Sequence, residues 1–97
     1  MKLFAVILTH GAAWRRGLPL EGQVDWTAHA AFMDALVEDG FVLLGGPLQT
    51  TEDVLLIIRS ESPAEIAGRL GGDPWHQQDL LRISRIAPWA LRLGSLA

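Results

Sequence analysis

The segment LFAVIL, residues 3–8, decides how the fold is read. Successive side chains of a strand point to opposite faces of its sheet. Both faces of this segment are apolar: Leu3, Ala5 and Ile7 lie on one, and Phe4, Val6 and Leu8 on the other. The segment DVLLIIR, residues 53–59, is apolar on both faces in the same way. Strands of this kind are typical of the centre of a sheet that is covered on both sides.

The first central strand, residues 2–9, is followed by a predicted helix and a predicted strand. The helix covers residues 25–39, with Asp25 or Thr27 as a possible N-terminal cap and Gly40 as its end. The strand is FVLLGGPL, residues 41–48, in which two glycines are expected to interrupt the pairing.

The second central strand is followed by the same pair of elements. Ser62 is a typical N-cap, Pro63 fits the first helical position, and Glu65 is spaced for a capping box. This helix is expected to end at Gly71 and Gly72. The last strand is LLRISRI, residues 80–86, which is more mixed in polarity and therefore suits a sheet edge.

The resulting order, β-α-β-β-α-β, predicts an α+β, ferredoxin-like fold for residues 1–97 as a single domain. It implies a four-stranded antiparallel sheet with two helices on one face. The other face would then expose apolar side chains, which is unusual for a monomer. We therefore expect a homodimer that packs through the open sheet face. The alternative is that the tail, residues 90–97, folds over part of that face.

Composition excludes several classes of protein. The 97 residues include 8 basic and 11 acidic ones, scattered along the chain, so a nucleic-acid surface is not expected. The chain has no cysteine, which rules out disulfides and thiolate chemistry. No apolar run approaches the roughly 18 residues of a membrane helix. The N-terminal apolar run is too short for a signal peptide, so a cytoplasmic protein is the default expectation.

His29 is the first candidate for chemistry. At about 100° per residue it falls within the apolar stripe of the first helix, which consists of Trp26, Ala30, Met33, Leu36 and Val37. Its imidazole therefore points toward the sheet. A core histidine that is bonded to a backbone carbonyl would give the same pattern, so the position alone does not identify a site.

Asp73 is the second candidate, in the turn DPW, residues 73–75. The simple interpretation is a helix cap, with Asp73 as N-cap and Pro74 at the first helical position. The functional interpretation is that Asp73 orients the ring of His29, because both helices lie on one face of this fold. A carboxylate on one imidazole nitrogen makes the other a better general base. Trp75 would supply an apolar wall.

Weaker candidates surround these two. Gly46 and Pro47 could let the backbone approach a ligand, although a strand end uses the same residues for a bulge. Trp14 and Arg15 could hold a substrate from the long loop at residues 10–23, which we expect to act as a mobile lid. The simpler interpretation is that both side chains are solvated. The three histidines lack metal-ligand spacing, so no metal is expected.

The segment WTAHAAFMDALVEDGFVLLGGPL, residues 26–48, with DPW at residues 73–75, resembles the YCII-related family. The resemblance extends over nearly the whole chain and implies a dimeric α/β-barrel protein. It also implies a cofactor-independent enzyme with a His and an Asp in its active site, at positions matched here by His29 and Asp73. The loop at residues 10–23 is longer than in the plainest members of that family.

These observations favour a small enzyme of proton-transfer type that acts on a small metabolite by elimination, isomerisation or hydrolysis. His29 would be the general base and Asp73 the group that orients it. The alternative is a non-catalytic module that binds or senses a small molecule in the same cavity. The sequence does not distinguish between the two.

Overall fold

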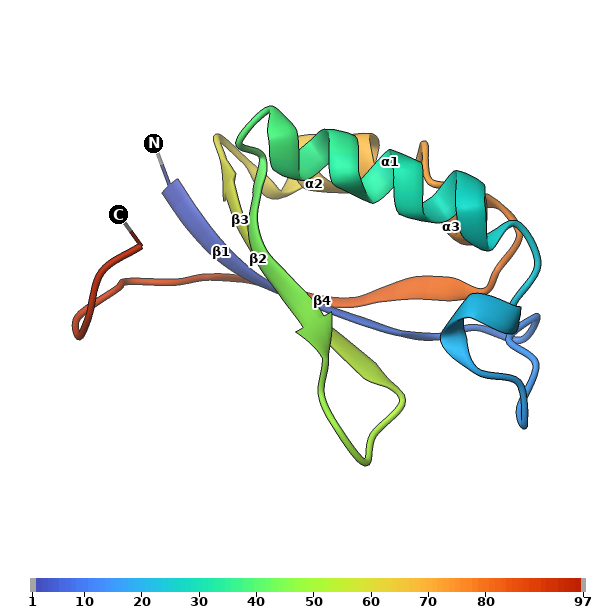
Figure 1. Cartoon of the computed structure of the whole chain (residues 1–97). Helices are drawn as coiled ribbons and strands as arrows, with labels where there is room; N and C mark the ends of the chain where they lie inside the picture. The colour runs from blue at the N-terminus through green and yellow to red at the C-terminus, as the bar shows by residue number, and fades with distance from the viewer. Residues whose placement is uncertain (1, 97) are drawn as a thin grey trace.

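The structure is a computed structural model and describes residues 2–96 (Figure 1). The elements along the chain are β1 (Lys2–His10), the 3₁₀ turn η1 (Leu20–Gly22), α1 (Trp26–Glu38), β2 (Val42–Pro47), β3 (Asp53–Ser60), α2 (Pro63–Leu70), α3 (Pro74–Gln77) and β4 (Leu81–Pro88). The predicted β-α-β-β-α-β order is therefore confirmed. The expectation of two helices is wrong by one, because α3 adds a single turn before the last strand.

The four strands form one antiparallel sheet in the order β2-β3-β1-β4. The two doubly apolar segments, β1 and β3, are thus its central pair, as the sequence predicts. Figure 1 shows α1, α2 and α3 together on one side of this sheet. The chain has the ferredoxin-like α+β fold.

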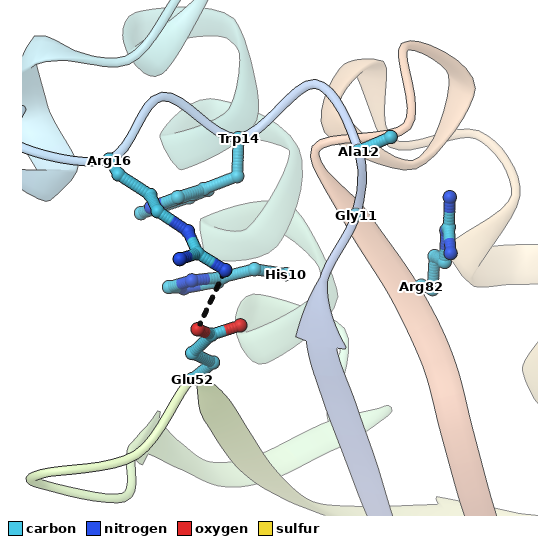
Figure 2. Close-up of a pocket in the computed structure, with 7 residues that line it drawn as sticks. All are labelled: His10, Gly11, Ala12, Trp14, Arg16, Glu52 and Arg82. Carbon is cyan, nitrogen blue, oxygen red and sulfur yellow. Dashed lines mark ion pairs between the residues drawn. The ribbon is translucent and has the colours of Figure 1, made fainter.

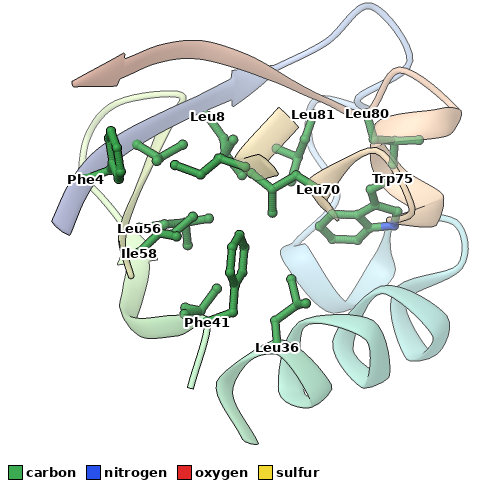
Figure 3. Close-up of a cluster of buried hydrophobic side chains, with 13 residues drawn as sticks. Phe4, Leu8, Leu36, Phe41, Leu56, Ile58, Leu70, Trp75, Leu80 and Leu81 are labelled. Carbon is green, nitrogen blue, oxygen red and sulfur yellow. The ribbon is translucent and has the colours of Figure 1, made fainter. Parts of the chain in front are cut away.

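Strand alternation decides which side chains meet the helices. On β1 the helix-facing residues are Phe4, Val6 and Leu8, and all three are buried. They join the core cluster of Figure 3, which includes Ile66 and Leu70 of α2. Burial of an aliphatic or aromatic side chain contributes about 1.5–3 kcal/mol to folding. This cluster is what fixes α2 to the sheet.

The remaining alternate residues of the central strands point to the face without helices. Ala5 pairs with Ile57 there, and Ile7 pairs with Leu55. In the tail, residues 90–97, Leu93 is 89% exposed, so this side chain does not pack on the open face.

The two helix starts differ from the sequence expectation. In α2, the Ser62 hydroxyl accepts a hydrogen bond from the Glu65 N–H at 3.1 Å, as predicted. The Glu65 carboxylate, however, accepts from the N–H of Glu61 at 3.0 Å and not from that of Ser62. In α1, Asp25 stands at the N-cap position in a left-handed conformation, with φ 55°, and its side chain does not cap the helix. Of the two expected caps, Asp25 thus takes the N-cap position without a capping bond, and Thr27 lies inside the helix.

Gly45 and Gly46 do not interrupt β2, contrary to the sequence expectation. The strand continues through them to Pro47, with Gly45 opposite Leu56. A Cβ on Gly45 would lie 2.7 Å from a Leu56 methyl carbon, so the glycine lets β2 pass close over that side chain. The irregularity lies earlier, as a register shift between Val42 and Leu44.

Candidate active site

His29 lies in the first turns of α1, on the side that faces the sheet. It is 9% exposed and is one of two buried residues of that helix, the other being Leu36. The predicted inward direction of His29 is therefore confirmed. The predicted stripe is wrong at Val37, which is 52% exposed, because this side chain borders a cavity and does not pack into the core.

Asp73 is the N-cap of α3 and is also the partner of His29. Its Oδ1 accepts a hydrogen bond from the Trp75 N–H at 3.0 Å, which is the predicted cap. Both of its carboxylate oxygens lie 2.9 Å from Nδ1 of His29. The two interpretations of the sequence are thus compatible, since one carboxylate serves both groups.

The contact with Asp73 sets the tautomer of His29. An ionised carboxylate can only accept hydrogen bonds, so Nδ1 carries the hydrogen and the neutral ring keeps its lone pair on Nε2. Within residues 2–96, Nε2 has no hydrogen-bond partner. Every fully buried side-chain nitrogen or oxygen in the same residues does have a partner, so Nε2 is not fully buried. Nε2 is therefore open to the surrounding space.

Aromatic rings hold this imidazole in place. His29 stacks on Trp75 with ring centres 3.8 Å apart and planes 7° from parallel. Trp75 is 1% exposed, and its indole N–H donates to the Val24 carbonyl at 2.6 Å. Trp14 meets the same indole edge-on at 5.4 Å. The base is therefore fixed by a carboxylate at its edge and by a buried indole at its face.

The side chains around His29 enclose a cavity of about 580 Å³ between α1 and the sheet. Its walls are mainly apolar, with Trp26, Met33 and Leu56 among them. The polar side chains that line it are His10, His29, Asp34, Thr51 and Asp53. Pockets of this size and character are typical of sites for small molecules.

Of the five other candidates that the sequence suggested, four line the cavity and one does not. Trp14, Trp75, Gly46 and Pro47 line the cavity with His29. Arg15 is exposed and does not line it, because its side chain projects outward while its backbone is bonded to Gln23. The structure therefore does not bring Arg15 to this cavity.

The loop at residues 10–23 is held by hydrogen bonds within itself and, near its start, by bonds to the segment before β4. The buried Gln23 amide donates to the carbonyls of Arg15 and Leu18, at 2.8 and 3.2 Å. Near the other end, the carbonyl of Asp79 accepts from Ala13 at 3.0 Å. The loop borders the cavity through Trp14 and Leu20, and the expectation that it acts as a mobile lid stays a prediction.

His10 also belongs to the cavity wall, although it was not among the predicted site residues. Residues 4, 6 and 8 of β1 face the helices, and the same alternation places residue 10 on that side at the end of the strand. His10 indeed lines the cavity, with its ring stacked on Trp14 at 3.8 Å. Gln23 was also missed, since nothing in the sequence marks a polar loop residue as buried.

Two further observations concern metals and membranes. Within residues 2–96, no three side chains of His, Asp or Glu are grouped so that they could hold a metal ion. Over the same residues, no helix has both the length and the apolar character needed to cross a membrane.

A comparison with solved structures finds a similar protein. It is the 5-chloro-2-hydroxyhydroquinone dehydrochlorinase from Burkholderia phenoliruptrix AC1100, in complex with 2,5-dihydroxybenzoquinone. The two chains superpose with a TM-score of 0.59 at 22% identity, and the match covers 95% of each. This likeness supports the fold. No family model matches the chain, and neither does any curated protein.

Proposed function

We propose that the chain is a small enzyme of the YCII-related type that removes a proton from a small molecule bound in the His29 cavity. The observation that carries this proposal is the His29–Asp73 contact at 2.9 Å, with Nε2 left unpartnered beside an apolar cavity. Nε2 accepts the proton, and the carboxylate stabilises the imidazolium that forms. The residues of the chain supply this chemistry without a cofactor.

The substrate is a small ring that bears carbonyl or hydroxyl groups. The aromatic side chains Trp14 and Trp26 offer apolar contacts to such a ring, while the buried Trp75 supports His29 from behind. The similar dehydrochlorinase was solved with a dihydroxybenzoquinone, which is of this class. In an elimination, His29 takes a proton from the substrate, the released electron pair forms a double bond, and the leaving group departs with its own bonding pair.

The test compares binding with turnover. We expect 2,5-dihydroxybenzoquinone to bind in a titration, and 5-chloro-2-hydroxyhydroquinone to release chloride in the presence of the protein. His29→Gln keeps a polar side chain of similar length but lacks the base, so it should bind the quinone and release no chloride. Thr27→Ala, on the exposed side of α1, is the matched control and should retain turnover.

The second candidate function is a non-catalytic binding module that uses the same cavity. It is favoured if the quinone binds while neither the chlorinated compound nor related ring substrates are converted. Failure of every such ligand to bind would contradict both functions.

We also propose that the chain forms a homodimer through the sheet face that the helices leave open. Ala5, Ile7 and Leu55 lie partly exposed on the central strands of that face, beside the buried Ile57. Light scattering should give about twice the chain mass of 10.6 kDa. Leu55→Glu should weaken association, whereas Leu93→Glu, at an exposed tail position, should not. A stable wild-type monomer would contradict the proposal.

A further inference from the structure

His10 is a second imidazole in the wall of the His29 cavity. It is the last residue of β1, and its backbone is held on both sides, by pairing with Leu81 of β4 and by an N–H bond to the Glu52 carbonyl at 3.2 Å. Its ring lies almost flat on Trp14, with planes 11° from parallel. The position and the plane of the ring are therefore both fixed.

The two ring nitrogens of His10 are not hydrogen-bonded to any of the described residues, 2–96, in contrast to Nδ1 of His29. The ring lines the main cavity and also a smaller one of about 280 Å³, so a single imidazole–indole stack separates the two spaces. Figure 2 shows this stack on the same side of the β1 end as Arg16 and Glu52, with Arg82 on the other side.

Burial is the main influence on the ionisation of the His10 ring, and it favours the neutral form. Burial lowers its pKa, the nearby carboxylates of Glu52 and Asp53 oppose that shift, and Arg16 adds to it. A neutral imidazole always keeps one N–H donor. A fixed, uncharged donor that faces a ligand cavity suits an oxygen on which negative charge develops.

We propose that His10 contacts the ligand directly and donates its ring N–H to a carbonyl oxygen of a small ring compound in the His29 cavity. The proposal deepens the proposed function and rests on it. When His29 removes a proton next to that carbonyl, electron density moves onto the oxygen, and the His10 N–H stabilises it. No proton leaves His10 in this step, so His29 carries the transferred proton alone.

The test uses two ligands of nearly the same shape, acetophenone and α-methylstyrene, which differ in having a carbonyl oxygen or a methylene group. Affinities are measured by NMR chemical-shift titration. His10→Phe keeps a flat ring against Trp14 but has no donor, while His10→Gln restores an N–H. We expect His10→Phe to weaken acetophenone binding roughly three- to tenfold, the scale of one neutral hydrogen bond. The affinity for α-methylstyrene should stay within about twofold, and His10→Gln should recover most of the loss.

Equal losses for the two ligands in His10→Phe would overturn the proposal, because they would reveal a role in packing alone. Failure of acetophenone to bind the wild-type protein would overturn it as well. The comparison does not depend on turnover, so it stays informative if His29 proves not to be a base. Conversely, if the His10→Phe variant converts a substrate at the wild-type rate, the proposed function stands and the role of His10 is contradicted.

Discussion

The substitution Asp73→Asn separates the two tasks of this carboxylate. In the wild-type protein Oδ1 accepts from the Trp75 N–H at 3.0 Å, and both oxygens lie 2.9 Å from Nδ1 of His29. An asparagine with its oxygen at the Oδ1 position retains the cap. Its NH₂ group then faces Nδ1, where two donors would meet. The conflict is relieved when the His29 proton moves to Nε2, which converts the open nitrogen from an acceptor into a donor.

The expected loss of folding stability in Asp73→Asn follows from the hydrogen bonds that change. A hydrogen bond to a charged group contributes about 1.5–3 kcal/mol and a neutral one about 0.5–1.5, so the folded state should lose about 1–2 kcal/mol. Both residues are buried, so solvent screening does not reduce this figure much. Turnover should fall far more, by about 10⁴-fold, the scale of the same change in a Ser–His–Asp triad.

The assay is ¹⁵N NMR of the His29 ring above its titration range, combined with urea unfolding. We expect the hydrogen on Nδ1 in the wild-type protein and on Nε2 in Asp73→Asn. Asp79→Asn is the control, since Asp79 is an exposed carboxylate that is paired with Arg82, and it should leave the His29 tautomer unchanged. An unaltered tautomer and unaltered turnover in Asp73→Asn would refute the reasoning and leave Asp73 as a cap only.

Four further outcomes are expected. Trp75→Phe removes the indole N–H bond to the Val24 carbonyl and leaves a void, so urea unfolding should show a loss of about 1–3 kcal/mol. Gly11→Ala would drive a Cβ into the Asp79 carbonyl oxygen and should lower the melting temperature markedly. In Gly46→Ala, the added Cβ would have no atom within 4 Å, so the melting temperature should stay unchanged. A large drop in the melting temperature would contradict the geometry of β2. Because burial lowers the pKa of His10, the folded state binds fewer protons than the unfolded one. Stability should therefore fall as the pH drops below the ordinary histidine range, and His10→Phe should flatten that dependence.

Much of the site could be predicted because its residues carry local signals. His29 falls on the inward side of a helix whose period can be read from its apolar neighbours. Asp73 precedes a proline and is therefore recognisable as a cap. The same kind of signal was available for His10, through the alternation of β1, but a histidine at a strand end resembles ordinary loop chemistry. Arg15 shows the limit of such reasoning, because the direction of a side chain in an irregular loop has no period to reveal it.

The sequence by itself determined the element order, the central place of residues 3–8 and 53–59, and the helix face on which His29 lies. These properties follow from periods of two and about 3.6 residues, which are local and need no knowledge of distant contacts. Only the tertiary structure decided that Asp73 meets His29 at 2.9 Å across 44 positions of the chain. It also decided that Trp75 stacks on the imidazole and that Gln23 fixes the loop. Those contacts depend on how α1, α3 and the loop pack over the sheet, and packing is set by the shapes of the whole core and not by any one segment.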